Sequence, residues 1–295
     1  MKIAVTGGTG FIGGRLIKHL RSGGHEVVNI SRTPQPPDLG VTTVTWDELQ
    51  SSPVILEGFD AIVNLAGESI NRRWTKEAKE RILRSRQVAA AQIAWVVERL
   101  QAKPKVVINA AGMSIYGTSE TETFDERSPH RAVDFLSSVC EAWEHAADQI
   151  QGTRLVKIRV GLVLDKQEGA FPLMALPYKL GVGGRVGSGK QWMSWIHIED
   201  MVGLIMYCIV NETISGPVNA TAPHPVTNQE FGRKLARTMH RPNLMPVPAF
   251  VLRLIFGELS TLLLEGQKVL PRALLEYGYT FKFETVEQAF ADMLS

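Results

Sequence analysis

The loop at residues 6–13, TGGTGFIG, constrains the fold of this chain more than any other stretch of its sequence. It places four glycines among eight residues, directly after the apolar run 2–5 and before an amphipathic helical pattern at 11–21. A glycine-rich turn between a strand and a helix exposes backbone N–H groups at the positive end of the helix dipole. This context predicts a site for the phosphates of a dinucleotide, and a glycine turn without a ligand is the alternative.

The three glycines of the GxxGxxG spacing have separate expected tasks. Gly7 permits a tight turn off the strand, Gly10 lets the backbone approach a diphosphate, and Gly13 lets the helix pack close to the strand. The loop residues that we expect to contact the cofactor are Gly7, Thr9, Gly10, Phe11, Ile12 and Gly13.

Apolar strand-like runs alternate with helical patterns through the first half of the chain. The predicted strands are 2–5, 27–30, 41–46, 60–64, 105–109 and 154–163, and the helices between them include 11–21, 76–100 and 137–150. Strands that are apolar along their whole length and separated by helices indicate a parallel sheet covered on both faces. The expected fold is therefore a doubly wound α/β sheet of the Rossmann type.

The regular alternation fades after about residue 165, where Pro, Gly and aromatic residues become more frequent. We expect a dinucleotide-binding domain at 1–165 and a smaller mixed lobe on the substrate side at 166–295. The helix predicted at 198–211, and one further strand, are expected to return to the main domain. The shorter helices 228–239 and 250–256 belong to the lobe.

The end of the second predicted strand indicates which dinucleotide is bound. An NAD site would place a carboxylate there for the ribose 2′-hydroxyl, whereas this chain has Ser31 and Arg32. A guanidinium suits a 2′-phosphate, so the prediction is NADP(H), and an exposed arginine in a solvated loop is the alternative. Asp47 either meets the adenine amino group or belongs to a helix cap in WDEL.

Several motifs together resemble one family. They are DAIVNLAG at 60–67, AGESINRRW at 66–74, Ser85-Arg86, Trp143-Glu144, WIHIED at 195–200, PVTNQEFGRKL at 225–235 and LLEGQKVLPRALLEYGYTF at 263–281. The chain resembles, over its whole length, the atypical extended short-chain dehydrogenases of the epimerase family. That family includes bacterial YfcH-like proteins and a human epimerase-family member, and it carries an extra C-terminal domain of unassigned function. The resemblance implies an NADP-binding protein.

Extended short-chain dehydrogenases use a Tyr-x-x-x-Lys pair as their acid–base group, and this chain has none. The residues four positions after Tyr116, Tyr178, Tyr207, Tyr277 and Tyr279 are Glu120, Val182, Asn211, Phe281 and Phe283. Aligning Trp143-Glu144 with the family puts Leu136 and Cys140 at the tyrosine and lysine positions. The hydroxyls nearest to the expected site are those of Ser114 and Tyr116, which become the catalytic candidates.

The resemblance also implies further cofactor contacts. Leu65, Ala66 and Gly67 would touch the cofactor through their backbone, and backbone near Val163 would receive the nicotinamide amide. Arg86 would point toward the cofactor phosphates. Because Arg81 and Arg84 lie on the same predicted helix, a solvated basic face is the alternative.

For several further residues, a structural role and a functional role have similar weight. Arg72, Arg73 and Trp74 either bind a flat or anionic substrate or form a surface loop that packs Trp74 beneath the lobe. His197 is a general base or, as we favour, part of a helix start. The loop 181–191 lacks a P-loop pattern, so we expect a flexible connection over the crevice, and no residue set predicts a metal site.

Composition narrows the partners and the compartment. A net charge of +2 favours neither nucleic acid nor an anionic membrane, and two cysteines are too few for a disulfide framework. The longest apolar run, 201–210, is too short to span a bilayer, and no signal peptide is evident. The expected protein is soluble and cytoplasmic, and by analogy a homodimer.

Two functions fit these observations. The first is an NADP(H)-dependent oxidoreductase or epimerase that acts on a small polar molecule, with a sugar nucleotide as one candidate. The second is a redox sensor that binds NADP(H) without catalysis, which the missing Tyr-Lys pair favours.

Overall fold

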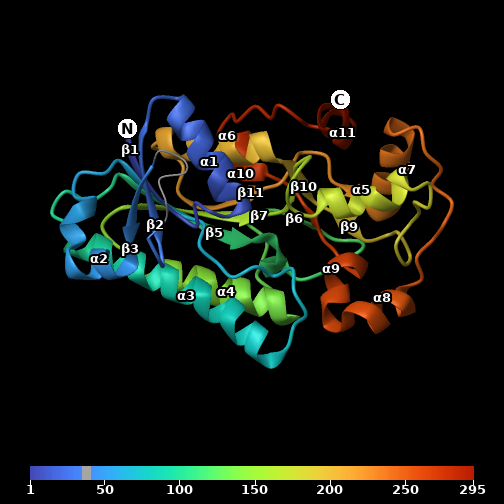
Figure 1. The fold of residues 1–295 in the computed structure, drawn as a ribbon, viewed down its shortest axis with the longest axis horizontal. Helices are drawn as coiled ribbons and strands as arrows, with labels where there is room; N and C mark the ends of the chain where they lie inside the picture. The colour runs from blue at the N-terminus through green and yellow to red at the C-terminus, as the bar shows by residue number, and fades with distance from the viewer. Residues whose placement is uncertain (35–40) are drawn as a thin grey trace.

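The computed structural model describes residues 1–34 and 41–295. Its centre is a parallel sheet of seven strands in the order β3-β2-β1-β4-β5-β7-β11 (Figure 1). These strands are β1 Lys2–Thr6, β2 Glu26–Ser31, β3 Thr42–Thr45, β4 Ala61–Asn64, β5 Val106–Gly112, β7 Arg154–Val160 and β11 Gly216–Ala220. The strand order changes direction between β1 and β4, which is the switch point at which ligands bind in such sheets.

Two layers of helices cover the sheet, with α1 and α6 on one face and α3 and α4 on the other (Figure 1). Their bounds are α1 Phe11–Ser22, α3 Lys76–Arg99, α4 Phe135–Ala147 and α6 Ile198–Val210, and the short α2 at the β3 edge is Trp46–Ser51. The first face buries Leu16, Ile17 and Met201, and the second buries Ile93 and Trp143. The predicted doubly wound sheet is confirmed.

Local sequence signals explain where the covering helices begin. Thr75 accepts a hydrogen bond from the N–H of Ala78 at the start of α3. Asp134 and Ser137 form a capping box, so α4 begins two residues before the predicted helix 137–150. Helix α1 starts differently, because Gly10 has no side chain with which to cap it.

The C-terminal lobe has its own apolar core. The remaining α-helices are α5 Phe171–Lys179, α7 Asn228–Thr238, α8 Ala249–Phe256, α9 Thr261–Leu264, α10 Arg272–Glu276 and α11 Val286–Leu294, of which α10 packs on β11 of the central sheet. Three pairs of short strands lie outside the central sheet: β8 Leu162–Leu164 with β10 Trp195–His197, β9 Trp192–Met193 with β12 Val226–Thr227, and β6 Thr123–Phe124 with β13 Lys268–Val269. The Phe290 ring centre lies 5.8 Å from that of Phe171 and 4.9 Å from that of Phe231. These aromatic contacts join α5, α7 and α11.

The predicted strand 154–163 is wrong in one respect, because it is divided at Gly161. Gly161 donates its N–H to the carbonyl of Ala220 at 3.1 Å, and the next N–H, of Leu162, goes to Ser194 at 2.9 Å. A Cβ at residue 161 would lie 2.6 Å from the Ser194 oxygen. Glycine therefore lets the chain leave the main sheet as β7 and continue as β8 in the lobe.

Candidate functional site

The glycine loop between β1 and α1 is too crowded for larger residues. Gly7 has φ +71°, and a Cβ there would lie 2.7 Å from the carbonyl oxygen of Leu65. A Cβ on Gly13 would overlap the carbonyl oxygen of Gly7, to which Gly10 donates its N–H at 2.9 Å. The predicted turn at Gly7 and the close approach at Gly13 are thus features of the structure.

The first turn of α1 carries backbone donors that no side chain accepts. No side chain caps the helix at Gly10, and its first turn has no acidic residue. Thr9 and Gly10 are exposed and Phe11 and Ile12 are half-buried, so the loop surface is open to solvent. Uncapped N–H groups and the helix dipole favour an anion at this point.

Sequence reasoning missed a role for Gly8. A Cβ there would overlap the side chains of Ile17 and Asn29. Asn29 is 5% exposed, and within residues 1–34 and 41–295 its Oδ1 has no hydrogen-bond partner. The polar Asn within the apolar run VVNI is the sequence signal that could have revealed it. A loop in which added Cβ atoms would collide with backbone fits the close approach of a dinucleotide, and the buried Asn29 oxygen beside it can accept a hydrogen bond from a water molecule.

A chain of buried polar side chains links three neighbouring strands, at the ends of β1 and β4 and within β5. Thr6 donates to Asn64 at 2.6 Å, and Asn64 donates to Asn109 at 2.6 Å. The three residues pair in register on β1, β4 and β5, and each is 0% exposed. Thr6 Oγ1 also accepts the N–H of Ala66 at 3.2 Å, which orients the segment after β4. The sequence signal that could have revealed this network is the polar residue that follows each of three apolar runs.

After β2, the structure leaves the Arg32 side chain available. Its side chain is exposed, and within the described residues it forms no ion pair. Ser31 donates a short hydrogen bond to the Thr33 carbonyl. The WDEL segment is a helix start, because Thr45 and Glu48 form a capping box, and Asp47 lies exposed in its first turn.

After β4, two residues of α3 hold the chain. The N–H of Glu68 donates to Ser85 Oγ at 2.9 Å, and Arg86 Nη1 donates to the Glu68 carbonyl at 3.0 Å. Leu65 and Ala66 are half-buried, and Gly67 is exposed. Arg86 is partly buried, so the alternative of a solvated basic face does not describe it.

Tyr116 belongs to a buried network. It is 0% exposed, donates to Asn219 Oδ1 at 2.8 Å and accepts from Arg159 Nη1 at 2.7 Å. Arg159 also binds Glu144, with Nε to Oε1 at 2.7 Å, and donates to His130 Nε2 at 2.7 Å. Burial raises the pKa of Tyr116 to about 12, although Arg159 opposes the shift. The hydroxyl is therefore neutral and already paired.

Ser114 differs from its neighbour. It is half-buried in the short 3₁₀ turn Met113–Tyr116 after β5, and its hydroxyl forms no hydrogen bond within residues 1–34 and 41–295. A ligand oxygen can therefore reach it without breaking an existing interaction.

Comparison with known proteins places the chain in a family. Residues 3–220 match the NAD dependent epimerase/dehydratase family, and residues 247–293 match a domain of unknown function, DUF1731. The chain belongs to the NAD dependent epimerase/dehydratase family. The epimerase family protein YfhF of Bacillus subtilis is 41% identical over 299 residues, which cover 100% of this chain and 98% of the relative.

Solved structures support the same placement. The crystal structure of human epimerase family protein SDR39U1 with NADPH has a TM-score of 0.93 and 38% identity, and covers 99% of both chains. The nucleoside-diphosphate sugar epimerase of Corynebacterium glutamicum has a TM-score of 0.80 and 31% identity, over 99% of this chain and 57% of that one. The resemblance stated from the motifs is confirmed.

The two residues that the motif alignment puts at the family's tyrosine and lysine positions are buried. Leu136 is 8% exposed and Cys140 6% exposed. Burial raises the pKa of the Cys140 thiol to about 12, with Arg86 opposing the shift, so the thiol stays protonated near neutral pH. Neither side chain can act as the missing acid or base.

Other family-derived expectations have mixed outcomes. Val163 is 8% exposed and packs with residues of α6, so only its backbone is available to a ligand. His197 is 2% exposed, accepts the Glu199 N–H at 3.3 Å and lies with its ring centre 3.9 Å from that of Phe283. Burial lowers the His197 pKa. It caps α6, as the structural interpretation predicted.

The segment after Gly67 does not form the arginine and tryptophan platform that was one of its two predicted alternatives. Trp74 donates to the Ile70 carbonyl at 3.0 Å and packs edge-on against Phe135, with ring centres 5.2 Å apart. Arg72 is ion-paired with Glu68. Trp74 thus packs on α4, rather than beneath the C-terminal lobe.

The loop 181–191 is tied to the lobe by backbone hydrogen bonds. Gly183 accepts N–H groups from Leu244 and Met245 at 2.9 and 3.1 Å, and Gly187 donates to Val247 at 2.9 Å. Its expected flexibility has no support in this bonding. In the part of the chain that the structure describes, no group of three or more His, Cys, Asp or Glu is suitable for a metal ion.

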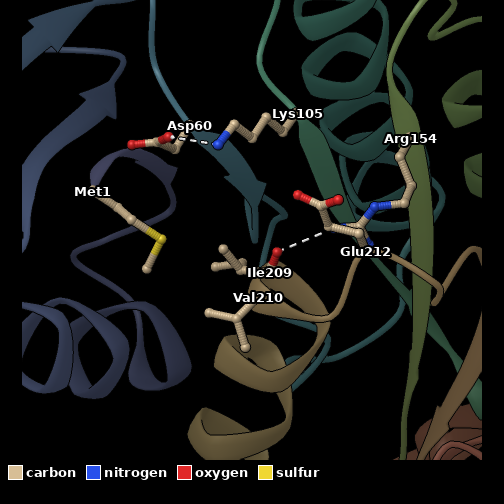
Figure 2. A pocket seen from close by; sticks show the side chains of 7 residues that line it. All are labelled: Met1, Asp60, Lys105, Arg154, Ile209, Val210 and Glu212. Carbon is tan, nitrogen blue, oxygen red and sulfur yellow. Dashed lines mark hydrogen bonds and ion pairs between the residues drawn. The ribbon is translucent and has the colours of Figure 1, made fainter.

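A hollow of about 620 Å³ lies at the opposite, amino-terminal edge of the strands (Figure 2). Asp60 and Lys105 face each other across 3.7 Å, and Arg154 donates to the carbonyls of Cys208, Ile209 and Ile214. These groups are already paired, so the hollow offers few free polar atoms.

Within residues 1–34 and 41–295, no helix combines the length and apolar character needed to cross a membrane.

Proposed function

We propose that this chain is an NADP(H)-dependent oxidoreductase or epimerase that acts on a small polar substrate, with nucleotide sugars as the first class to test. The observation that carries the proposal is the uncapped start of α1 within a glycine cradle. It lies in a fold shared over 99% of the chain with a human relative solved with NADPH.

The proposed cofactor site follows the sheet edge. Backbone amides of the loop, among them those of Thr9, Phe11 and Ile12, bind the diphosphate. Arg32, with Ser31 beside it, binds the 2′-phosphate. The backbones of Leu65, Ala66 and Gly67 line the cofactor, Arg86 contacts it from α3, and the Val163 backbone receives the nicotinamide amide.

The bound nicotinamide supplies hydride transfer at its C4 atom. Ser114 is proposed to hold the substrate oxygen, because its hydroxyl is free and follows β5. Tyr116 remains a candidate proton carrier only if its bonds to Arg159 and Asn219 break. A proton therefore more readily reaches the substrate oxygen through Ser114 and water.

The test has two stages. Calorimetry with NADPH and NADH is expected to show tighter binding of NADPH. The loaded protein is then mixed with carbonyl compounds and nucleotide sugars while absorbance of the reduced nicotinamide is followed. Epimerisation of nucleotide sugars is followed separately by chromatography, because an epimerase returns its hydride. Binding of NADH with negligible affinity for NADPH would overturn the cofactor assignment.

A redox sensor without catalysis is the second candidate. The buried Leu136 and Cys140 at the usual catalytic positions favour it. A panel that leaves both NADPH and the sugars unchanged, with NADPH still bound, supports the sensor. Turnover above a cofactor-free blank supports the enzyme.

A further inference from the structure

The guanidinium of Arg86 is fixed between the end of β4 and helix α4. Its Nη1 donates to the carbonyl oxygens of Ile82 at 2.9 Å and Glu68 at 3.0 Å. Its Cζ lies 5.0 Å from the ring centre of Trp143, and a Cβ on Gly67 would lie 3.1 Å from that Cζ. Backbone, indole and glycine together define one position for this charge.

That positive charge has no partner of opposite sign. In the described parts of the chain, Nε and Nη2 of Arg86 donate no hydrogen bond, and no carboxylate lies within salt-bridge distance. The Glu68 carboxylate is paired with Arg72. Burial lowers the pKa of Arg86, but a guanidinium remains protonated in proteins. A partly buried, uncompensated cation should therefore act strongly on any nearby ligand charge.

The sheet order places this charge on one side of the proposed cofactor. Arg32 follows β2, on the adenosine side of the switch point between β1 and β4. Arg86 lies against Gly67, which follows β4, and near Cys140, whose Sγ is 2.7 Å from a Cβ built on Gly112 at the end of β5. A dinucleotide that crosses the switch point places its nicotinamide on the β4 and β5 side.

Cys140 does not neutralise the charge, because burial keeps its thiol protonated. Cys140 also occupies the position aligned with the family lysine. The positive charge in this region therefore comes from α3, through Arg86, instead of from α4.

We propose that Arg86 makes the site select the reduced dinucleotide over the oxidised one. This inference rests on the proposed NADP(H) function. The oxidised nicotinamide ring carries a positive charge and the reduced ring is neutral, so a fixed cation on this side repels only the oxidised form. We expect a preference for the reduced form of about tenfold or more, because like charges within one site repel appreciably at an effective dielectric constant of about 20.

The test measures dissociation constants of NADPH and NADP⁺ by calorimetry for four proteins: wild type, Arg86→Gln, Arg86→Lys and Arg84→Gln. Arg84 is the matched control, because it is exposed, lies on the same helix and changes the net charge equally. We expect the wild-type protein to bind NADPH more tightly than NADP⁺. In Arg86→Gln, the ratio of the NADP⁺ to the NADPH dissociation constant should fall about tenfold. Arg86→Lys should keep most of the wild-type ratio. Arg84→Gln should change the ratio by less than about twofold.

The ratio of the NADP⁺ to the NADPH dissociation constant distinguishes selection of the reduced form from other roles of Arg86. Equal weakening of both forms by Arg86→Gln, with an unchanged ratio, would mean a phosphate-binding or structural role and would overturn the inference. Wild type that binds NADP⁺ as tightly as NADPH overturns it without any variant. Wild type that binds neither dinucleotide contradicts the proposed function itself.

Discussion

The adenosine half and the nicotinamide half of the proposed site are built in different ways. The adenosine half, around β1, α1 and β2, consists mainly of backbone and glycine, with Arg32 exposed at its edge. The nicotinamide half, around β4, β5 and α4, contains charged and aromatic side chains. Most of these are bonded to one another, as Tyr116 and Arg159 are.

This difference separates binding from reaction. A backbone cradle retains its function while exposed side chains change, because it depends on glycine and helix geometry. A reaction centre depends on side chains, and the motif alignment puts Leu136 and Cys140 at its usual acid–base positions. The first half can thus keep a cofactor site while the second half acquires other chemistry or none.

The largest expected effect comes from breaking the buried network of the nicotinamide half. Replacing Arg159→Met leaves Glu144, itself 2% exposed, without its closest cation. Burial alone would lower the Arg159 pKa, but bonds to Glu144 and Tyr116 raise it overall, so the pair is charged. We expect the free energy of unfolding to fall by about 3–5 kcal/mol in urea titrations.

The control for Arg159 is the exposed pair Arg127–Glu276, whose side chains are 63% and 49% exposed. Arg127→Met should cost at most about 1 kcal/mol. Similar losses in both variants would contradict a structural role for the Arg159 network.

The next largest effect is expected at the glycine cradle. Gly13→Ala introduces a Cβ that overlaps the Gly7 carbonyl, which should cost about 1–3 kcal/mol and weaken NADPH binding by more than about tenfold. Gly14→Ala is the matched control, because its Cβ would lie 3.6 Å from the nearest atom, the Gly8 oxygen. That variant should keep binding and gain up to about 1 kcal/mol from helix propensity. Equal NADPH affinity in the two variants would rule out the cradle.

The sequence predicted the central sheet because its strands are buried on both faces. A short apolar run such as AIVN, placed before a helical pattern, is typical of a strand in a covered parallel sheet. Gly13 was also predictable, since a Cβ there would overlap the Gly7 carbonyl oxygen of the same motif, and Gly7 was predictable as a turn residue, which the structure shows with φ +71°. The division of 154–163 at Gly161 was not predictable, because it depends on Ser194 and Ala220, which are distant in sequence.

For the nicotinamide half, the sequence predicted only which catalytic residues are missing. The missing Tyr-Lys pair could be read from spacing, whereas the pairing of Tyr116 with Arg159 and Asn219 could not. Such bonds join the 3₁₀ turn after β5 with β7 and β11, and they have no short-range sequence pattern. The polar residues Thr6, Asn64 and Asn109 were visible at the ends of apolar runs, but their mutual bonds required the strand order.

A smaller effect, confined to binding, is expected at the edge of the adenosine half. Arg32→Ser should weaken NADPH about tenfold, equivalent to about 1.4 kcal/mol, because a charge-assisted contact to the 2′-phosphate is lost. NADH affinity should not change, since NADH lacks that phosphate. Arg73→Ser, which removes another exposed arginine, should leave both affinities unchanged. If calorimetry finds that Arg32→Ser weakens the binding of NADPH and NADH equally, then a residue other than Arg32 determines the preference for NADPH.

The smallest change in stability is expected at Ser114. Its hydroxyl has no partner among the described residues, so Ser114→Ala should alter the free energy of unfolding by less than about 0.5 kcal/mol. Tyr116→Phe removes the hydroxyl to which Arg159 Nη1 donates and which donates to Asn219 Oδ1, and it should cost about 1–3 kcal/mol. With a substrate found by the panel, turnover should fall at least about tenfold in Ser114→Ala while NADPH affinity is retained. The result that would contradict this is unchanged turnover in Ser114→Ala together with a fall in the turnover of Tyr116→Phe that is larger than its unfolded fraction explains. That result would assign the catalytic role to Tyr116.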